Sequence, residues 1–385
     1  MKPQFFKFVI ALVLSVFIFS PSLIAQQTAE DYFNLGNAKI REGKHQEAVQ
    51  AFSMSLGMNS DNAAGYYGRG YARAYLKDHR GAIADYDKCL ELNPRDANAY
   101  LARGISKRAQ EDHKGAVQDL NRAIDLNPAE SQTYFVRGLS RLKLDNPKGA
   151  LSDFNKAIDL NPENSVMYEK RGQCKTKLED YAGSLPDFSK AIEISPKRAQ
   201  AYTGRGFSKM KMGEYKAAIQ DLSKALEINP DDAEALYRRG FCKSMLEDFQ
   251  SAKIDFDRAL AQDPTNVEAL YGRGFVKFKL ESYKEAILDF NKSIEIDSKS
   301  SNSFYSRGRA KYYLDDYAGA LQDCDKAIEL NSKHTEVYFI RGKSKYWLED
   351  FKSAVKDFNK VINLNPKDHS ALVCRAQTKI NFRMF

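Results

Sequence analysis

The chain has 385 residues, of which 43% are hydrophobic and 29% are charged, and its formal net charge is +8 at neutral pH. This composition excludes a disordered chain and a membrane-embedded one, and it is typical of a folded soluble protein. Basic and acidic residues alternate along the chain with no basic block, which is usual for solvated helix surfaces and argues against nucleic acid as the partner.

The first 25 residues have the layout of a secretory signal peptide. Lys2 and Lys7 precede an apolar run over residues 8–19. A basic region followed by an apolar region predicts export to a periplasmic or secreted location, with cleavage after Ala25 or Ser22. The run of 12 residues is too short to cross a bilayer, which requires about 20 residues, so we expect no membrane span after cleavage. The alternative is an uncleaved N-terminal segment that tethers the protein.

A fixed period of 34 residues begins at residue 29, after a short mature N-terminus at residues 26–28. The period is marked by the dipeptides Arg69-Gly70, Arg103-Gly104, Arg137-Gly138, Arg171-Gly172, Arg205-Gly206, Arg239-Gly240, Arg273-Gly274, Arg307-Gly308 and Arg341-Gly342. Such a period is the signature of a stacked repeat protein. With this Gly as position 8, ten complete repeats occupy residues 29–368 without an insertion, and residues 369–385 form a half repeat. An inserted catalytic domain has no room, so we expect no enzyme activity.

Each repeat has the pattern of two helices with a break between them. Leu222 and Leu226 are four residues apart in the second half of one repeat, which is helical spacing. Position 16 carries Asp or Asn in seven repeats, and these residues cap helix N-termini. The second helix should end at an Asn-Pro pair such as Asn229-Pro230, because proline cannot continue a helix. Small residues, Gly at position 8 and Ala at position 20, predict a close approach of the two helices.

These features resemble the tetratricopeptide repeat family over residues 29–385. The shared pattern is an aromatic residue at position 4, Gly at 8, Ala at 20, an aromatic residue or Leu at 24, and Pro at 32. The resemblance implies an all-α fold, a right-handed α-solenoid of ten helix-turn-helix repeats, with residues 369–385 as a C-terminal capping helix. It also implies a concave face, lined by the first helices, that binds a peptide or a partner protein.

Position 7 departs from the family pattern. Nine repeats have Arg there, the same nine have Asp at position 23, and all ten have Lys or Arg at position 11. The first repeat has Leu35 and Ala51 instead and so lacks both partners. We hypothesise a bidentate Arg–Asp pair within a hairpin or between neighbouring hairpins, which would fix the register of the helices. The alternative is a basic ladder that binds an anionic ligand.

Aromatic residues are enriched at positions 5, 9, 12 and 13, which face the groove in the family. Aromatic anchors within a polar surround are typical of binding patches. Trp347 is the only Trp and is the first candidate for mutation. The alternative is that a given ring packs between neighbouring first helices. The candidate partner-binding residues are Tyr67, Tyr71, Tyr75, Phe207, Tyr237, Phe241, Tyr271, Phe275, Phe278, Tyr305, Tyr312, Tyr313, Phe339, Tyr346 and Trp347.

We therefore expect a monomeric, non-catalytic scaffold that needs no cofactor or metal and binds a protein or peptide in its groove. The five cysteines fall in repeats that are not adjacent, which argues against disulfides. His45, His79 and His113 share position 17 of three successive repeats and are expected to be packed rings rather than zinc ligands. The alternative function is binding of RNA or another polyanion through the Arg/Lys ladder.

Overall fold

The computed structural model describes residues 27–384, which form twenty-one helices and no strands. The predicted signal peptide lies outside the described residues, so export and the cleavage site stay predictions. The chain divides after Pro162 into two compact blocks, called here the N-terminal block and the C-terminal block.

Each repeat contributes one pair of helices, and the half repeat contributes the last helix. The N-terminal block contains α2 (Ala29–Arg41), α3 (His45–Met58), α4 (Ala63–Tyr75), α5 (His79–Leu92), α6 (Ala97–Ala109), α7 (His113–Leu126), α8 (Ser131–Lys143) and α9 (Pro147–Leu160). The C-terminal block contains α10 (Ser165–Lys177), α11 (Tyr181–Ile194), α12 (Ala199–Lys211), α13 (Tyr215–Ile228), α14 (Ala233–Met245), α15 (Phe249–Gln262), α16 (Val267–Lys279), α17 (Tyr283–Ile296), α18 (Ser301–Tyr312), α19 (Tyr317–Leu330), α20 (Thr335–Trp347), α21 (Phe351–Leu364) and α22 (His369–Met384).

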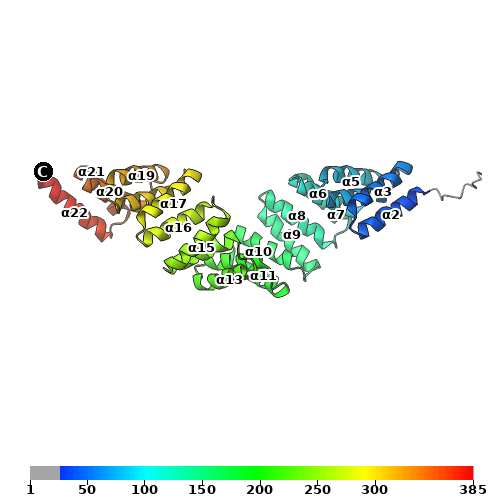
Figure 1. Cartoon of the computed structure of the whole chain (residues 1–385), viewed down its shortest axis with the longest axis horizontal. Coiled ribbons are helices and arrows are strands. Elements are labelled where there is room, and N and C mark those ends of the chain that lie inside the picture. Colours follow the sequence, from blue (N-terminus) through cyan, green and yellow to red (C-terminus); the bar gives the residue numbers. More distant parts are fainter. Residues whose placement is uncertain (1–26, 385) are drawn as a thin grey trace, which may run out of the picture. The chain divides into compact units, whose positions relative to one another are not determined.

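The predicted helical hairpins are confirmed. In each repeat the two helices pack against each other, and within a block the second helix packs against the first helix of the next repeat (Figure 1). The predicted caps also form: Asp78 accepts a hydrogen bond of 2.9 Å from the backbone N–H of Gly81, and the other Asp and Asn residues at position 16 cap their helices in the same way. Each such cap contributes about 1 kcal/mol.

Close packing explains Gly at position 8. A Cβ atom at Gly274 would lie 2.7 Å from the ring of Phe290, which is shorter than two carbon atoms can approach. Ala286, at position 20 of the same hairpin, is fully buried. The two helices therefore meet along their smallest side chains, as predicted.

The turn between the two helices contains a feature that the sequence did not reveal. Position 15 has a left-handed backbone in every complete repeat: Gly43 and Gly213 have φ of 74° and 80°, and the other eight repeats place Lys, Asp or Glu there with φ between 54° and 65°. This residue lies just after the end of the first helix, where glycine is favoured because side chains are strained at positive φ. Most repeats therefore carry a small local strain at this turn.

Exchanging residues at position 15 should change stability in opposite directions. We expect Glu247→Gly to raise the free energy of unfolding by about 0.5–1 kcal/mol and Gly213→Ala to lower it by about 1 kcal/mol, because only glycine adopts this backbone without strain. Urea denaturation followed by circular dichroism measures both changes. A shift in the same direction for both variants would contradict the explanation.

The last helix, α22, packs against α21 and α20. Its buried residues include Ala371 and Thr378, whereas Val373 and Ile380 are exposed. In the fifth repeat, helix α11 continues through Pro186 with the same length as the other second helices. None of the described helices combines the length and the apolar composition that crossing a bilayer requires.

Candidate functional site

The Arg that recurs at position 7 is paired within its own hairpin. Arg205 donates from Nη2 to Oδ1 of Asp221 at 2.7 Å and from Nε to Oδ2 at 3.0 Å, which is the bidentate geometry predicted. The same pair forms in all nine repeats that have both residues, with Nη2–Oδ1 distances of 2.5 to 2.7 Å. The hypothesis of a structural ion pair is confirmed.

The basic residue at position 11 belongs to the same cluster. Lys209 Nζ lies 2.8 Å from Oδ2 of Asp221, and the equivalent contact forms in the other eight repeats. The nine Asp side chains are buried, with 1–5% of their surface exposed. Each buried carboxylate is therefore neutralised by two cations from the first helix of its hairpin.

The third donor of the Arg reaches the preceding repeat. Nη1 of Arg239 donates to Ser223 Oγ at 3.1 Å, and Nη1 of Arg273 donates to Asp257 Oδ1 at 2.9 Å. These acceptors occupy position 25, which is Ser, Asn or Asp in every complete repeat; that regularity was the sequence signal for the contact, and it was missed. Burial disfavours the charge of Arg273, but its bonds to Asp289 and Asp257 outweigh burial and raise its pKa. We call the pairs at positions 7, 11 and 23, with the acceptor at 25, the Arg–Asp ladder.

The first helices of repeats 6 to 8 carry a pocket of about 520 Å³. Four predicted residues line it together: Tyr237 and Phe241 from α14, and Tyr271 and Phe275 from α16. Phe241 is 38% exposed, so its ring is accessible in the pocket wall. We call this the central aromatic pocket. Its lining also includes residues that were not predicted, namely Met210, Lys211, Tyr215, Ser244, Met245, Phe256, Glu268 and Gly272.

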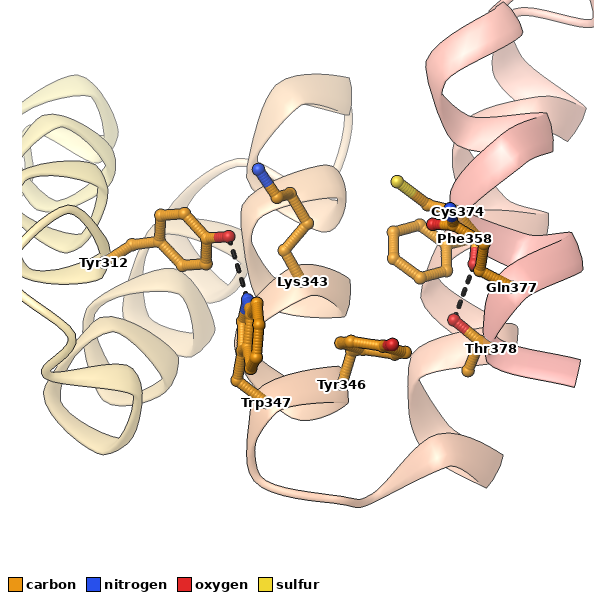
Figure 2. Close-up of a pocket in the computed structure, with 8 residues that line it drawn as sticks. All are labelled: Tyr312, Lys343, Tyr346, Trp347, Phe358, Cys374, Gln377 and Thr378. Carbon is orange, nitrogen blue, oxygen red and sulfur yellow. Dashed lines mark hydrogen bonds between the residues drawn. The ribbon is translucent and has the colours of Figure 1, made fainter. Parts of the chain in front are cut away.

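A second pocket of about 240 Å³ lies between α20 and α22, and Figure 2 shows its lining. Trp347 Nε1 donates to the hydroxyl of Tyr312 at 3.1 Å, and the indole stacks on Tyr317 with ring centres 5.8 Å apart. Trp347 is nevertheless 55% exposed. Tyr346 accepts a hydrogen bond of 2.8 Å from Asn381. These contacts hold the aromatic side chains in place while leaving the indole surface open.

The remaining predictions for the last repeats meet in a neighbouring pocket of about 490 Å³. Tyr305, Tyr313 and Phe339 line it, together with Arg309 and Lys343. Burial raises the pKa of the Tyr305 hydroxyl, so this residue is a neutral donor at physiological pH. Tyr313 is 47% exposed.

The N-terminal block has its own aromatic pocket, of about 320 Å³. Tyr67, Tyr71 and Tyr75 line it as predicted, and Tyr75 stacks on His45 with ring centres 4.0 Å apart. The interpretation of His45 as a packed ring is therefore confirmed.

Two of the candidate partner-binding residues, Phe278 and Phe207, lie outside the aromatic pockets described above. Phe278 is only 8% exposed and lies in a core cluster with Ala286 and Phe290, which corrects the expectation that its ring is available to a ligand. It is covered because Tyr283 and Tyr313 pack against it. Phe207 lies in a polar pocket of about 300 Å³, where the guanidinium of Arg238 lies 4.0 Å from its ring centre.

No cluster of His, Cys, Asp and Glu suited to a metal ion occurs within residues 27–384. The five cysteines are free thiols. Burial raises the pKa of Cys242 and of Cys324 to about 12, so both are protonated at neutral pH and are poor nucleophiles.

Family models described as tetratricopeptide repeat match residues 29–62, 63–96, 97–130, 135–199, 199–232, 246–301 and 335–368, which is more than half of the chain. No match was found among proteins whose functions have been curated. Among solved structures, the APC/C hetero-tetramer Cut9-Hcn1 contains a chain that is 13% identical, with 92% of this chain and 91% of that chain covered and a TM-score of 0.53.

Two further solved structures are shorter. YrrB, described as a TPR protein with an unusual peptide-binding site, is 26% identical over 49% of this chain and 97% of its own, with a TM-score of 0.44. A tetratricopeptide repeat protein from Parabacteroides merdae is 21% identical over 65% of this chain and 98% of its own, with a TM-score of 0.47. From the repeat geometry and the family matches together, the chain belongs to the tetratricopeptide repeat family.

Proposed function

We propose that this protein is a non-catalytic scaffold that binds segments of partner proteins along its first helices. The observation that carries the proposal is the central aromatic pocket, in which Tyr237, Phe241, Tyr271 and Phe275 come from two successive first helices. Aromatic side chains that are partly exposed and held by neighbours are the usual anchors of protein interfaces, because they bury much surface at little entropic cost.

The geometry of the Arg–Asp ladder supports this function over binding of RNA or another polyanion through the ladder. In the nine repeats that have the pair, the Arg at position 7 and the basic residue at position 11 are already paired with a buried carboxylate, as Arg239 and Lys243 are with Asp255. A ligand anion would have to displace that carboxylate and leave it unpaired inside the protein, which is costly. We therefore infer that the ladder stabilises the fold and does not bind a ligand.

The proposed compartment rests on the predicted signal peptide. If residues 1–25 direct export, the partners are other envelope or secreted proteins. Crosslinking in the native cell followed by affinity purification would identify these partners and would also recover nucleic acid if the alternative function were correct.

Replacing one accessible ring in each of two pockets, Phe241 and Trp347, should weaken capture of partners. We expect the double variant Phe241→Ala/Trp347→Ala to recover each partner at least tenfold less than the unmodified protein does, because interface anchors each contribute about 2 kcal/mol. Quantitative mass spectrometry of crosslinked material measures the change. Ile254→Ala/Leu288→Ala is the matched control, since these side chains are 60% and 61% exposed on second helices. Equal recovery by the anchor variant and the unmodified protein would refute the proposed groove.

A further inference from the structure

Two sets of basic residues on the first helices of the C-terminal block differ in their partners. Those of the ladder are paired with carboxylates, whereas Lys211, Lys279, Arg309 and Lys343 occupy groove positions 9 and 13. Among the described residues, none of these four has a carboxylate oxygen within ion-pairing distance, unlike the ladder pairs such as Lys243–Asp255. Each ladder cation is paired with a carboxylate, whereas these four groove cations are not.

These four cations alternate with aromatic residues in a regular way. Repeats 6 and 8 have an aromatic at position 9 and a cation at position 13, as in Phe275 and Lys279. Repeats 9 and 10 exchange the two types, with a cation at position 9 and an aromatic at position 13, as in Lys343 and Trp347. Positions 9 and 13 are one helical turn apart on the same helix face. Each of these repeats therefore presents one ring and one positive charge side by side.

The side-chain contacts agree with this pattern. Lys211 Nζ lies 5.6 Å from the ring centre of Phe207, and Lys279 Nζ lies 5.7 Å from that of Phe275. The guanidinium of Arg309 lies 4.6 Å from the ring centre of Phe278, and Lys343 Nζ lies 4.6 Å from that of Tyr312. A ring attracts a cation without cancelling its charge, so these side chains are held in position and remain able to pair with an anion.

The acidic residues near the groove favour a peptide over a nucleic acid as the ligand. Glu268 lines the central aromatic pocket and Glu336 lines the pocket formed by the last repeats. A phosphodiester backbone carries a charge at every nucleotide and would meet these carboxylates along its path. A peptide carries negative charge only where it has Asp or Glu, so it can match separate cations and avoid both glutamates.

We infer that the groove of the C-terminal block selects extended protein segments in which Asp or Glu stands next to Phe, Leu or another large apolar residue. The apolar side chain enters the central aromatic pocket, and the neighbouring carboxylates pair with Lys211 and Lys279. This inference rests on the proposed function and adds the chemistry of the ligand to it. Affinity should therefore fall as salt is raised, because these pairs form at the groove surface.

The test is a selection of random peptides displayed on phage against the full chain, followed by fluorescence polarisation of the recovered peptides. We expect recovered peptides to combine acidic with large apolar residues, and to bind Lys211→Glu/Lys279→Glu about tenfold or more weakly, because charge complementarity becomes repulsion. Selection on that variant should recover basic peptides instead. Lys216→Glu/Lys284→Glu is the matched control, with the same change in charge at exposed positions of second helices, and should bind as the unmodified protein does.

Other outcomes separate the two proposals. Peptides without acidic enrichment that still lose affinity with Phe241→Ala would overturn the charge selectivity and leave the groove function standing. If no peptide is enriched, or if Phe241→Ala does not change the affinity for the enriched peptides, the proposed function of the groove is refuted as well. Tighter binding of a single-stranded oligothymidine that is lost in Lys211→Glu/Lys279→Glu would assign the groove to nucleic acid and overturn the inference.

Discussion

Replacing Asp255 with Ala is expected to lower the free energy of unfolding by about 3 kcal/mol, because it leaves two cations without their counter-ion in a largely buried site. Asp255 is 1% exposed. It accepts hydrogen bonds from Arg239 at 2.9 and 2.7 Å, and Lys243 Nζ lies 2.7 Å from its second oxygen. Urea denaturation measures the loss, and hydrogen exchange locates it, since we expect α14 and α15 to lose protection before other helices.

The control for this prediction is an exposed ion pair in the neighbouring repeat. Glu227 pairs with Lys224, and both side chains are more than half exposed. Glu227→Ala should change the free energy of unfolding by no more than about 0.5 kcal/mol, because exposed pairs are screened by solvent. If Asp255→Ala proved as mild as Glu227→Ala, the ladder would not be a stabilising feature of the fold.

Truncating Phe256 to Ala should lower the free energy of unfolding by a similar amount, about 3–5 kcal/mol, because packing contacts are lost. The ring is 1% exposed. A Cβ atom at Gly240 of the same hairpin would lie 3.2 Å from it, and one at Gly272 of the next repeat would lie 2.5 Å from it. Because both glycines leave room for this ring, its removal opens a cavity between two repeats that neither helix can fill.

Phe241→Ala is the comparison for Phe256→Ala, since both rings line the central aromatic pocket. Phe241 is 38% exposed, so its loss should cost little stability and much binding. Thermal denaturation and peptide affinity, measured on both variants, separate the two roles. A large loss of stability in Phe241→Ala would show that its ring supports the fold rather than a ligand.

The repeats of this chain were sufficient to predict one contact of the Arg–Asp ladder but not the other. Arg at position 7 and Asp at position 23 are present together in nine repeats and absent together from the first, and this co-occurrence was enough to predict the pair. The contact of Arg273 with Asp257 was not predicted, because it joins two repeats, and its acceptor varies among Ser, Asn and Asp. A period fixes which residues are equivalent, but it does not state which of them lie close across a repeat boundary.

The sequence predicted which positions of the repeat face the groove, but it did not predict which of the aromatic rings there are exposed. Positions 5 and 9 do bring Tyr237, Phe241 and Phe275 to one pocket. Phe278 shares the same pattern, yet Tyr283 and Tyr313 cover it. Whether a ring is open depends on the size of the side chains at the start of the second helix of its own repeat and at the end of the first helix of the next repeat, which differ between repeats. For the same reason Tyr215, on a second helix, was not recognised as part of the pocket.

Because position 25 offers a side-chain oxygen in every complete repeat, any of the nine repeats with Arg at position 7 can make this contact to whichever repeat precedes it. Removal of residues 267–300 would place Arg307 directly after the repeat that contains Asp257, and Asp257 is the same kind of acceptor as the Asn291 that Arg307 now contacts. Gain or loss of a block of 34 residues in the gene therefore preserves the junctions. The groove can therefore become longer or shorter by whole repeats during evolution. The aromatic and charged residues that each repeat places in the groove can change independently of those in other repeats.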